Sequence, residues 1–516
     1  MSQNPLVLTL DFGTQSVRTT LINKQGEIVY LSKKIYEPLY FSPKKGYAEQ
    51  YADFYWDNLI ACIKKMVKEA KDKLKDVVAM TVTTFRDSAV LLDENNKPLR
   101  PVILWLDQRL AKAREKLPLL HRIAFKIVGM MDTINMNRTR TPAHWVKENE
   151  PEIWAKTEKY VNISTYINYR LTGELADSPG GLTGHFPIHF KKSQWYKEGA
   201  MKGRIFGIPN RMLPRIVPSG GEIGVLLDSV ADQLGLPKGL KLIATGSDKG
   251  CETIGLGCLT PNMAAISYGT ACSIEVSNPV YHEPEKFLPA YAGAVPGLYS
   301  LDVQIYRGYW MLRWFANEFA SEIEKESSLK KVPTEAVLNE WLDDVPPGSD
   351  GLILQPYWGP GVARPLGKGA IVGFSSVHTR KHIYRAIVEG IAFELREGLE
   401  GIERSQKQKV KIMRISGGGS LSDKICQITA DIFGREISRI QTSESTSLGA
   451  AVAIFAAIKE FENVYDAVDS MVKVSKIFKP NMQNHARYNQ IFKELYKKVY
   501  PRLNPLNRKI NKLFKR

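Results

Sequence analysis

The sequence predicts an α/β protein with two related halves that face each other across a cleft. A strand, a turn containing Gly-Thr and a second strand occur over residues 7–22 and again over residues 263–276, about half the chain apart. A unit repeated at this spacing indicates internal duplication. The chain has no Gly/Ser-rich linker near residues 250–260, so we expect the halves to pack directly against each other.

Each half alternates apolar runs with helical patterns, as in a sheet covered by helices. Apolar runs at residues 7–10 and 17–22 predict strands, and apolar side chains at helical spacing predict a helix over residues 51–70. The same two patterns predict strands at 77–82, 240–244, 263–267, 272–276 and 410–415, helical structure from about 106 to 172, and helices at 249–256, 424–433 and from about 447 to 457.

The composition is that of an ordinary folded protein. Of the 516 residues, 44 % are hydrophobic and 24 % are charged, which excludes a mostly disordered chain, a collagen and a fibrous coil. No run approaches the roughly 18 apolar residues that span a bilayer, and the first residues lack the pattern of a signal peptide. The five cysteines form no CxxC pair, which disfavours a disulfide frame or a zinc site. We therefore expect a cytoplasmic protein without a membrane span.

The net charge of +17 is concentrated at one end of the chain. Residues 476–516 contain 12 Lys or Arg and a single acid, Glu494. We expect a solvated basic terminus; the alternative is a segment that binds an anionic partner. No zinc finger or RNA-recognition motif accompanies it, so we expect no nucleic-acid partner.

Three turns rich in glycine and hydroxyl side chains follow predicted strands, at residues 11–16, 268–272 and 416–420. Glycine lets the backbone approach a phosphate closely, and exposed N–H groups bind anions. Any one of these segments is also explained by a simple chain reversal. Because the sequence lacks GxxxxGK[ST] and a GxGxxG after the first strand, a Walker ATPase and a Rossmann dehydrogenase are disfavoured. The three turns together predict a nucleotide held between two related domains.

Two acids, Asp11 and Asp248, each end an apolar run, where α/β proteins place their active sites. A carboxylate at position 248 is suited to accept a proton from a hydroxyl that attacks a γ-phosphate. Asp11 is suited to hold magnesium through water. The alternative for Asp248 is a helix N-cap.

Arg86, Asp87 and Trp105 also follow predicted strands. A guanidinium and a carboxylate bind hydroxyls, and an indole covers the apolar face of a polyhydroxylated substrate. The alternatives are a surface ion pair and a core tryptophan.

In these features the chain resembles the FGGY carbohydrate kinases. The similar segments run in order from about residue 6 to 458: residues 10–18 (first phosphate loop), 105–109 (W-x-D-x-R), 213–224, 246–248 (the G-x-D of the catalytic base), 267–270 (second phosphate loop), 369–389, 416–434 (adenosine-binding turn and helix) and 447–451.

This resemblance implies two actin-like (ribonuclease H-like) domains around a central cleft. We expect residues 1–255 to bind the sugar or polyol and to carry the first phosphate loop, residues 256–475 to bind ATP, and residues 476–516 to form the basic tail. The expected site residues are Asp248 as catalytic base; Gly13, Thr14, Gln15, Ser16, Arg18, Gly269, Thr270, Gly417, Gly418, Gly419 and Ser422 for ATP; Arg86, Asp87, Trp105 and Asp248 for the acceptor; and Asp11 and Asp248 for Mg²⁺.

The acceptor is left open because the chain mixes features. Ketose-specific members carry Gln-Met-His-Gly where this chain has Phe-Arg-Asp-Ser at residues 85–88, which is closer to the Arg-Glu of glycerol kinases, whereas the Gly-Gly-Gly turn resembles that of pentulose kinases. The expected acceptor is a ketose such as a pentulose or a glycerol-like polyol, with a homodimer as a possible assembly. The rival hypotheses are a non-catalytic sugar- or nucleotide-sensing protein on the same fold and an actin- or chaperone-type ATPase.

Overall fold

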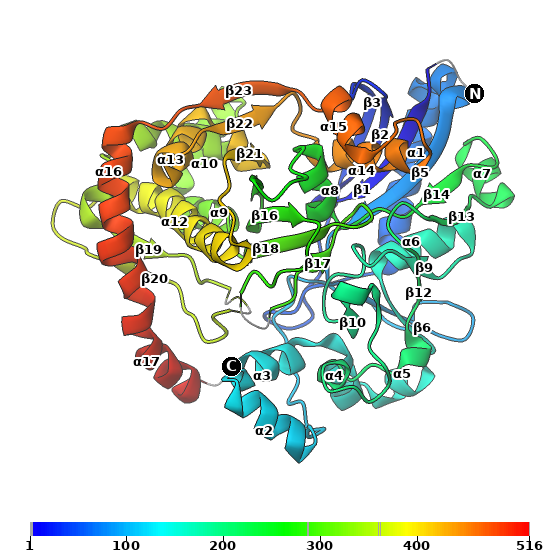
Figure 1. Cartoon of the computed structure of the whole chain (residues 1–516), viewed down its shortest axis with the longest axis horizontal. Coiled ribbons are helices and arrows are strands. Elements are labelled where there is room, and N and C mark those ends of the chain that lie inside the picture. The colour runs from blue at the N-terminus through cyan, green and yellow to red at the C-terminus, as the bar shows by residue number, and fades with distance from the viewer. Residues whose placement is uncertain (1–3, 286–287, 360, 362, 515–516) are drawn as a thin grey trace.

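The fold is built on two mixed β-sheets, one from each half of the chain (Figure 1). The structure, a computed structural model, describes residues 4–285, 288–359, 361 and 363–514. The six-stranded sheet has the order β13-β14-β5-β1-β2-β3 and the seven-stranded sheet the order β17-β18-β16-β15-β21-β22-β23. Their strands are β1 (Leu6–Phe12), β2 (Ser16–Asn23), β3 (Ile28–Ile35), β5 (Val77–Thr84), β13 (Glu222–Val225) and β14 (Lys241–Ile243), and β15 (Met263–Tyr268), β16 (Cys272–Asn278), β17 (Tyr291–Ala292), β18 (Tyr299–Ile305), β21 (Ile412–Ser416), β22 (Ile437–Ile440) and β23 (Val474–Phe478).

The two sheets repeat one topology. In the first, β1 pairs antiparallel with β2 and parallel with β5, β2 pairs antiparallel with β3, and β5 pairs parallel with β14. In the second, β15, β16, β18, β21 and β22 pair in the same way. The duplication predicted from two Gly-Thr turns therefore extends to the order and direction of five strands in each half.

Helices cover the sheets, and a small four-stranded sheet (β4-β7-β6-β8) adds to the first half. The remaining elements of the first half are α1 (Ala52–Glu69), α2 (Leu119–Ile127), α3 (Met131–Arg140), α4 (Pro142–Asn149), α5 (Pro151–Lys156), α6 (Ile163–Thr172), α7 (Asp228–Leu234), β4 (Glu49–Gln50), β6 (Ala89–Leu92), β7 (Val102–Ile103), β8 (Lys159–Asn162), β9 (Ala176–Asp177), β10 (Ile188–His189), β11 (Gln194–Trp195) and β12 (Arg215–Ile216). Those of the second half are α9 (Trp310–Phe319), α10 (Ser321–Lys330), α11 (Thr334–Leu338), α12 (Arg380–Gln406), α13 (Asp423–Phe433), α15 (Val464–Met471), β19 (Ile353–Gln355) and β20 (Ala370–Val372). Among the residues that the structure describes, no helix has both the length and the apolar character needed to cross a membrane.

Two helices, α8 (Asp248–Gly255) and α14 (Ser445–Ala457), join the halves. Apolar side chains of both helices and of both sheets form one shared core. The helix backbones touch, because a Cβ at Gly449 would lie 1.8 Å from the carbonyl oxygen of Cys251. No side chain can occupy that space, so the contact between the halves depends on glycine.

Replacement of Gly449 by alanine is expected to lower the free energy of unfolding by about 3 kcal/mol, because the added methyl group meets backbone that cannot move aside. Urea unfolding measures this change. The matched control is Gly401→Ala in α12, where the nearest atom to a new Cβ is 3.6 Å away. That control is expected to gain about 0.5–1 kcal/mol from helix propensity. Equal effects of the two changes would contradict the close contact.

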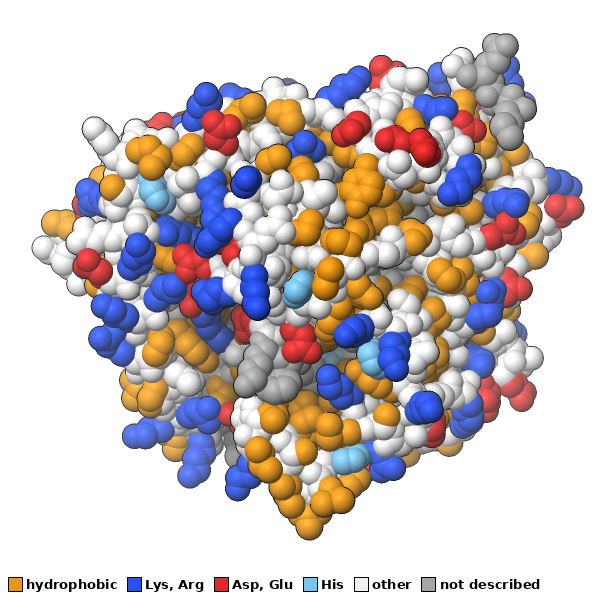
Figure 2. Space-filling model, in the orientation of Figure 1, with side chains coloured by type: hydrophobic (Ala, Val, Ile, Leu, Met, Phe, Trp, Pro, Cys, Tyr) orange, Lys and Arg blue, Asp and Glu red, His pale blue; other side chains and the backbone are white. Residues whose placement is uncertain are grey.

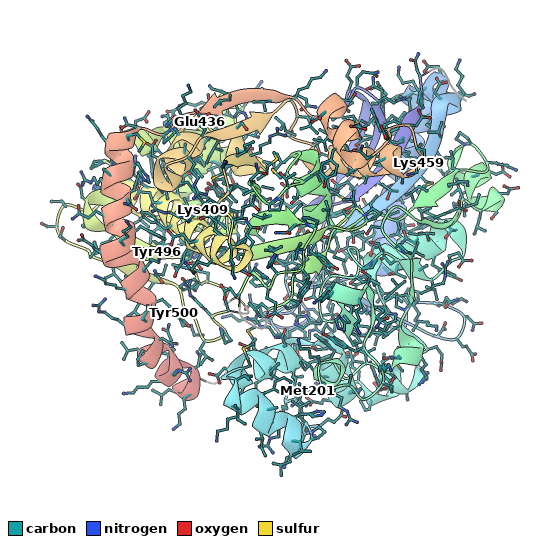
Figure 3. The ribbon with its side chains drawn as sticks, in the orientation of Figure 1. Met201, Lys409, Glu436, Lys459, Tyr496 and Tyr500 are labelled. Carbon is teal, nitrogen blue, oxygen red and sulfur yellow. The ribbon has the colours of Figure 1, made fainter. Side chains whose placement is uncertain are left out.

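The basic terminus differs from its expected solvated form. Residues 482–513 form α16 (Met482–Ile491), a π-helical turn (Phe492–Tyr496) and α17 (Lys497–Leu513). Tyr488, Phe492 and Tyr496 are fully buried in the core of the second half. The Tyr496 hydroxyl donates to a carboxylate oxygen of Glu394 at 2.9 Å, and Figure 3 labels Tyr496 and Tyr500 along this segment. The expectation of a wholly solvated terminus is therefore wrong for its first part, because aromatic residues at helical spacing anchor it. The domain bounds 1–255, 256–475 and 476–516 stay a prediction.

Candidate active site

A cleft of about 1740 Å³ is lined by both halves of the chain. Turns at the ends of β1, β15 and β21 reach it, as does the start of α8. All of the residues that the sequence singled out line it: Asp11, Gly13, Thr14, Gln15, Ser16, Arg18, Arg86, Asp87, Trp105, Asp248, Gly269, Thr270, Gly417, Gly418, Gly419 and Ser422. The fold thus brings together, in one cavity, groups that are up to 411 positions apart in the sequence.

The first turn is a tight link between β1 and β2. Its Gly13 N–H donates to the Ser16 carbonyl oxygen at 3.0 Å. Asp11 is the penultimate residue of β1 and forms an ion pair with Arg18 at 3.3 Å. Arg18 also pairs at 2.9 Å with Glu444, just before α14 in the other half. The guanidinium therefore links the first turn to the second half of the chain.

Asp11 has the properties of a carboxylate that is suited to hold a cation. Burial raises its pKa to about 7; the Arg18 guanidinium opposes this rise, and the Asp248 carboxylate adds to it. Its Oδ1 atom is buried and makes no hydrogen bond with the described part of the chain. An unpartnered carboxylate oxygen in the same cleft as a second acid, Asp248, fits the carboxylate ligands that magnesium prefers.

Asp248 is the first residue of α8, and several contacts hold the turn before it. The Ser247 N–H donates to the Gly180 carbonyl oxygen at 3.1 Å, and the Ser247 hydroxyl accepts from Arg86 Nε at 2.9 Å. Asp248 Oδ1 accepts from the next N–H, that of Lys249, at 2.8 Å. Ser247, not Asp248, occupies the N-cap position, so the helix-cap alternative for Asp248 is wrong. Burial raises the pKa of Asp248, while Lys249 and Arg86 oppose the rise.

The sequence analysis missed a charged pair directly after Asp248. Lys249 Nζ lies 3.0 Å from Glu252 Oε2 and donates to the Ser267 hydroxyl. Glu252 Oε1 accepts from the Ser416 hydroxyl at the end of β21. The ammonium borders the second turn, since a Cβ at Gly269 would lie 3.8 Å from it. The available signal was a Lys and a Glu three positions apart, in a helix whose other residues are mostly small.

Arg86 follows β5 and extends into the second half. Its guanidinium pairs with Asp302 on β18 at 2.5 Å and with Glu275 on β16 at 3.4 Å. Burial raises the pKa of Glu275, to which the Asp302 carboxylate adds, while Arg86 opposes the rise. Both acids lie in strands and were not singled out by the sequence analysis. The charge of Arg86 is therefore balanced by two carboxylates of the protein.

Asp87 is held by His185, another residue that the sequence analysis missed. Asp87 Oδ2 lies 2.6 Å from His185 Nδ1, and Oδ1 accepts from the His185 N–H at 2.8 Å. Burial alone would raise the pKa of Asp87, but His185 lowers it below its ordinary value. Asp87 has a φ of +57° and lies against Gly184, where a Cβ would be 2.6 Å from Asp87 Oδ1. No motif around His185 predicted this contact.

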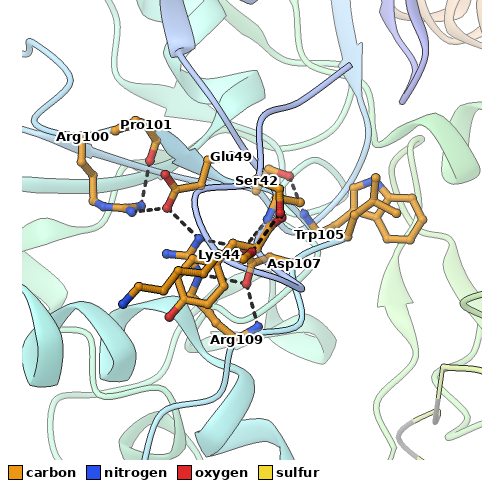
Figure 4. Close-up of polar contacts among 12 residues, drawn as sticks. Ser42, Lys44, Glu49, Arg100, Pro101, Trp105, Asp107 and Arg109 are labelled. Atoms are coloured by element: carbon orange, nitrogen blue, oxygen red, sulfur yellow. Dashed lines mark hydrogen bonds and ion pairs between the residues drawn. The ribbon is translucent and has the colours of Figure 1, made fainter. Parts of the chain in front are cut away.

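Hydrogen bonds and ion pairs hold the W-x-D-x-R segment in place (Figure 4), and its Trp105 lines the cleft. Asp107 accepts hydrogen bonds from the backbone N–H and the guanidinium of Arg109, each at 2.8 Å, and from the Ala48 N–H at 2.7 Å. Arg109 also pairs with Glu49 at 2.6 Å. At the cleft, the Trp105 indole N–H donates to the Thr14 hydroxyl at 3.3 Å. Trp105 thus contacts the first turn, while Asp107 and Arg109 are structural.

Replacement of Asp107 by asparagine is expected to lower the free energy of unfolding by about 2 kcal/mol, because it removes one of the two carboxylates, Asp107 and Glu49, that pair with the buried Arg109 guanidinium. Urea unfolding measures this loss. The control is Asp232→Asn, which removes an exposed ion pair with Lys238 and is expected to change stability by less than about 1 kcal/mol. A similar small effect of Asp107→Asn would contradict the bracing role.

The Gly-Gly-Gly turn leaves open backbone next to the cleft. Gly417 has a φ of +83°, and a Cβ there would lie 2.6 Å from the Tyr268 carbonyl oxygen. A Cβ at Gly418 would meet nothing within 4 Å, so there is room for a ligand to approach. Ser422 caps α13 by accepting from the Ile425 N–H at 3.4 Å. The open backbone of this turn, just before α13, fits a phosphate or nucleoside at a helix start.

Comparisons with known proteins agree with this geometry. A model of the FGGY family of carbohydrate kinases, N-terminal domain, matches residues 6–255, and the C-terminal domain model matches residues 264–458. A xylulose kinase of Lactococcus lactis is 28 % identical over 498 residues, covering 94 % of this chain and 95 % of that protein. A glycerol kinase of Thermococcus gammatolerans is 27 % identical over 489 residues, covering 93 % and 94 %.

A solved structure, that of a gluconate kinase from Lactobacillus acidophilus, superposes with a TM-score of 0.81 at 22 % identity, covering 97 % of this chain and 98 % of that one. At this identity the likeness is one of fold. The predicted class, α/β with two actin-like domains around a cleft, is confirmed.

Proposed function

This chain belongs to the FGGY family of carbohydrate kinases, and we propose that it transfers the terminal phosphoryl group of ATP to a hydroxyl of a small sugar or polyol bound in the cleft. One observation supports the proposal most directly: Asp248, the three glycine turns, and Arg86, Asp87 and Trp105 all line a single cavity. This arrangement lets an acceptor hydroxyl and a phosphoryl donor meet at Asp248 while the two halves exclude water.

In the proposed reaction Asp248 is the general base. Its carboxylate accepts the proton of the acceptor hydroxyl as the oxygen forms a bond to the γ-phosphorus, and the bond from that phosphorus to the bridging oxygen of ADP breaks. The raised pKa of Asp248 makes it a stronger proton acceptor than an exposed aspartate. Lys249, 3.0 Å from Glu252 and next to the Gly269 turn, is proposed to hold positive charge near the transferred group.

Asp11 and Asp248 are the carboxylates that we propose for Mg²⁺, directly or through water. Bound magnesium neutralises charge on the phosphates and orients them for in-line transfer. The unpartnered Oδ1 of Asp11 supports its role. We propose that the phosphates contact the first two turns, at Gly13, Thr14, Gln15, Ser16, Arg18, Gly269 and Thr270. The rest of the nucleotide is proposed to contact the third turn, at Gly417, Gly418, Gly419 and Ser422.

The acceptor is proposed to be neutral and rich in hydroxyls. Arg86 is already paired with Asp302 and Glu275, so its charge is balanced without a sugar acid. Asp87, ionised beside His185, retains oxygens that accept hydrogen bonds from hydroxyls. Trp105 lines the same cleft and offers an apolar ring face. Xylulose and glycerol, the substrates named for the relatives, belong to this class.

The test is release of ADP from MgATP by the purified chain, measured against polyols, ketopentoses, ketohexoses, deoxysugars and aldonic acids. Release that depends on a neutral polyol or ketose is the expected result. Release that depends only on an aldonic acid would overturn the proposed neutral acceptor. ATP binding without release for any acceptor would favour the sensing protein instead. A homodimer and a cytoplasmic location stay predictions.

A further inference from the structure

An exposed apolar face on α2 is not covered by any described part of the chain. Its inner side is packed, since Phe125 is buried in a small core with Leu117, Ile134 and Ile205, to which Met201 adds (Figure 3). The opposite side carries side chains at helical spacing that are exposed, up to 80 % for Ile127. These are Leu119, Leu120, Ile123, Ile127 and Val128. Figure 2 shows apolar side chains gathered at the lower tip of the molecule, where α2 lies in Figure 1.

The end of α17 has a second face of the same kind. Its exposed apolar side chains recur at intervals of four, three and one: Leu506, Ile510, Leu513 and Phe514. Towards the protein, Asn507 is buried and the Asn511 side-chain amide donates to the Leu366 carbonyl oxygen at 3.2 Å. The two helices come from opposite halves of the chain, yet Arg508 of α17 pairs with Asp132 at the start of α3 at 3.1 Å. Figure 1 accordingly shows the C-terminal end of α17 beside α3 and α2. We call the nine exposed apolar residues and the cations around them the α2–α17 surface.

The charge around the α2–α17 surface is predominantly positive, with Asp132, paired with Arg508, and Glu115 at its edge. Residues 116–131 and 495–516 contain no Asp or Glu. Exposed cations flank both apolar faces: Lys116, Arg122, Lys126, Arg502, Lys509 and Lys512. An amphipathic helix with large apolar side chains on one face and Lys or Arg beside them is typical of an element that lies in a membrane interface.

We propose that the α2–α17 surface binds the surface of a membrane containing anionic phospholipids. The apolar side chains would enter the boundary between headgroups and acyl chains, and the cations would meet the lipid phosphates. A second copy of this chain fits poorly, because a symmetric contact would bring two cationic surfaces together. Nucleic acid offers phosphates to the cations but no apolar region in which the nine apolar side chains could be buried. This inference concerns association of the protein with a membrane surface and does not depend on the proposed reaction.

The experiment is flotation of the full-length protein with vesicles of phosphatidylcholine containing about 30 mol % phosphatidylglycerol, compared with pure phosphatidylcholine. Binding to the anionic vesicles that weakens as salt rises from about 0.1 M to about 0.5 M is expected. Equal binding to both vesicles, or binding to neither, would overturn the proposal.

Paired variants identify the surface. Lys509→Gln with Lys512→Gln is expected to weaken binding by about fivefold for each charge removed, whereas Lys64→Gln with Lys65→Gln on α1 leaves it unchanged. Leu120→Ser with Ile127→Ser is expected to weaken binding more than tenfold, and the control is Leu329→Ser, an apolar residue on α10 that is 85 % exposed. None of these residues lines the cleft, so ADP release reports separately on the reaction.

Three results would overturn the lipid assignment. The first is vesicle binding that the α2–α17 variants do not reduce. The second is a concentration-dependent dimer that Leu120→Ser with Ile127→Ser abolishes, without any vesicle binding. The third is that the protein binds duplex DNA tightly, loses this binding in the lysine variants, and does not bind anionic vesicles. Loss of flotation only in the α2–α17 variants, with unchanged melting temperature, supports the proposal.

Discussion

Asp248→Asn is expected to lower kcat by about a thousandfold, because the amide cannot accept the proton of the attacking hydroxyl. The variant is expected to fold at least as well as the parent. The folded-state pKa of Asp248 is raised above 3.8, so its contribution to stability is present below pH 3.8 and is lost as the pH rises through the folded value. At neutral pH the buried carboxylate is therefore destabilising, and the neutral amide removes that cost. Coupled measurement of ADP release gives kcat, and thermal unfolding gives stability.

The control for this change is Asp232→Asn, which alters an exposed acid on α7 and is expected to leave kcat unchanged. Nucleotide affinity, measured by calorimetry, separates a lost base from a lost binding site. An Asp248→Asn protein with a kcat near that of the parent would remove Asp248 from its proposed role. Loss of ATP binding together with activity would assign the residue to the nucleotide instead.

Lys249→Met is expected to lower kcat by about a hundredfold, because a cation near the transferred group is lost. The change also leaves Glu252 buried without its partner at 3.0 Å, which is expected to lower the free energy of unfolding by about 3 kcal/mol. The ammonium holds the pKa of Asp248 down against burial. Its removal is therefore expected to move the acid limb of the kcat profile to higher pH.

A second variant separates the two effects of Lys249. Lys249→Met with Glu252→Gln removes both charges of the pair, so it is expected to recover much of the lost stability but little of the lost kcat. Lys249→Arg, which keeps the positive charge, is expected to retain more activity than Lys249→Met. If the double variant regained both stability and kcat, Lys249 would have only a structural role, as the partner of Glu252.

The strands and their turns were the predictable part of the fold. The run at residues 7–10 lies within β1, and the run at 263–267 lies within β15. Both signals are local, because an apolar run followed by glycine and hydroxyl side chains specifies a strand and a tight turn wherever it occurs. Because the signal is local, two short strand–turn–strand patterns about 250 positions apart were enough to reveal the duplication.

The terminal segment shows where charge misled the prediction. Its 12 cations suggested solvent exposure, but Tyr488, Phe492 and Tyr496 recur every four residues and are fully buried. A helix can bury such a stripe while its lysines remain in water on the other side. The spacing of the aromatic residues therefore predicts burial correctly for the first part of this segment, and the net charge predicts solvent exposure correctly for the end of α17.

The sequence by itself predicted which residues line the cleft, because Asp11, Asp248 and the glycine turns all stand where predicted strands end, and an apolar run followed by such residues is a local signal. Only the tertiary structure decided what each of them contacts. Arg86 and Asp302 are 216 positions apart, and Asp87 and His185 are 98 apart. No local pattern encodes such pairs, since they form when two sheets pack around α8 and α14. Burial in that packing also set the pKa of Asp11 and Asp248, because desolvation depends on the surrounding fold rather than on neighbours in the chain.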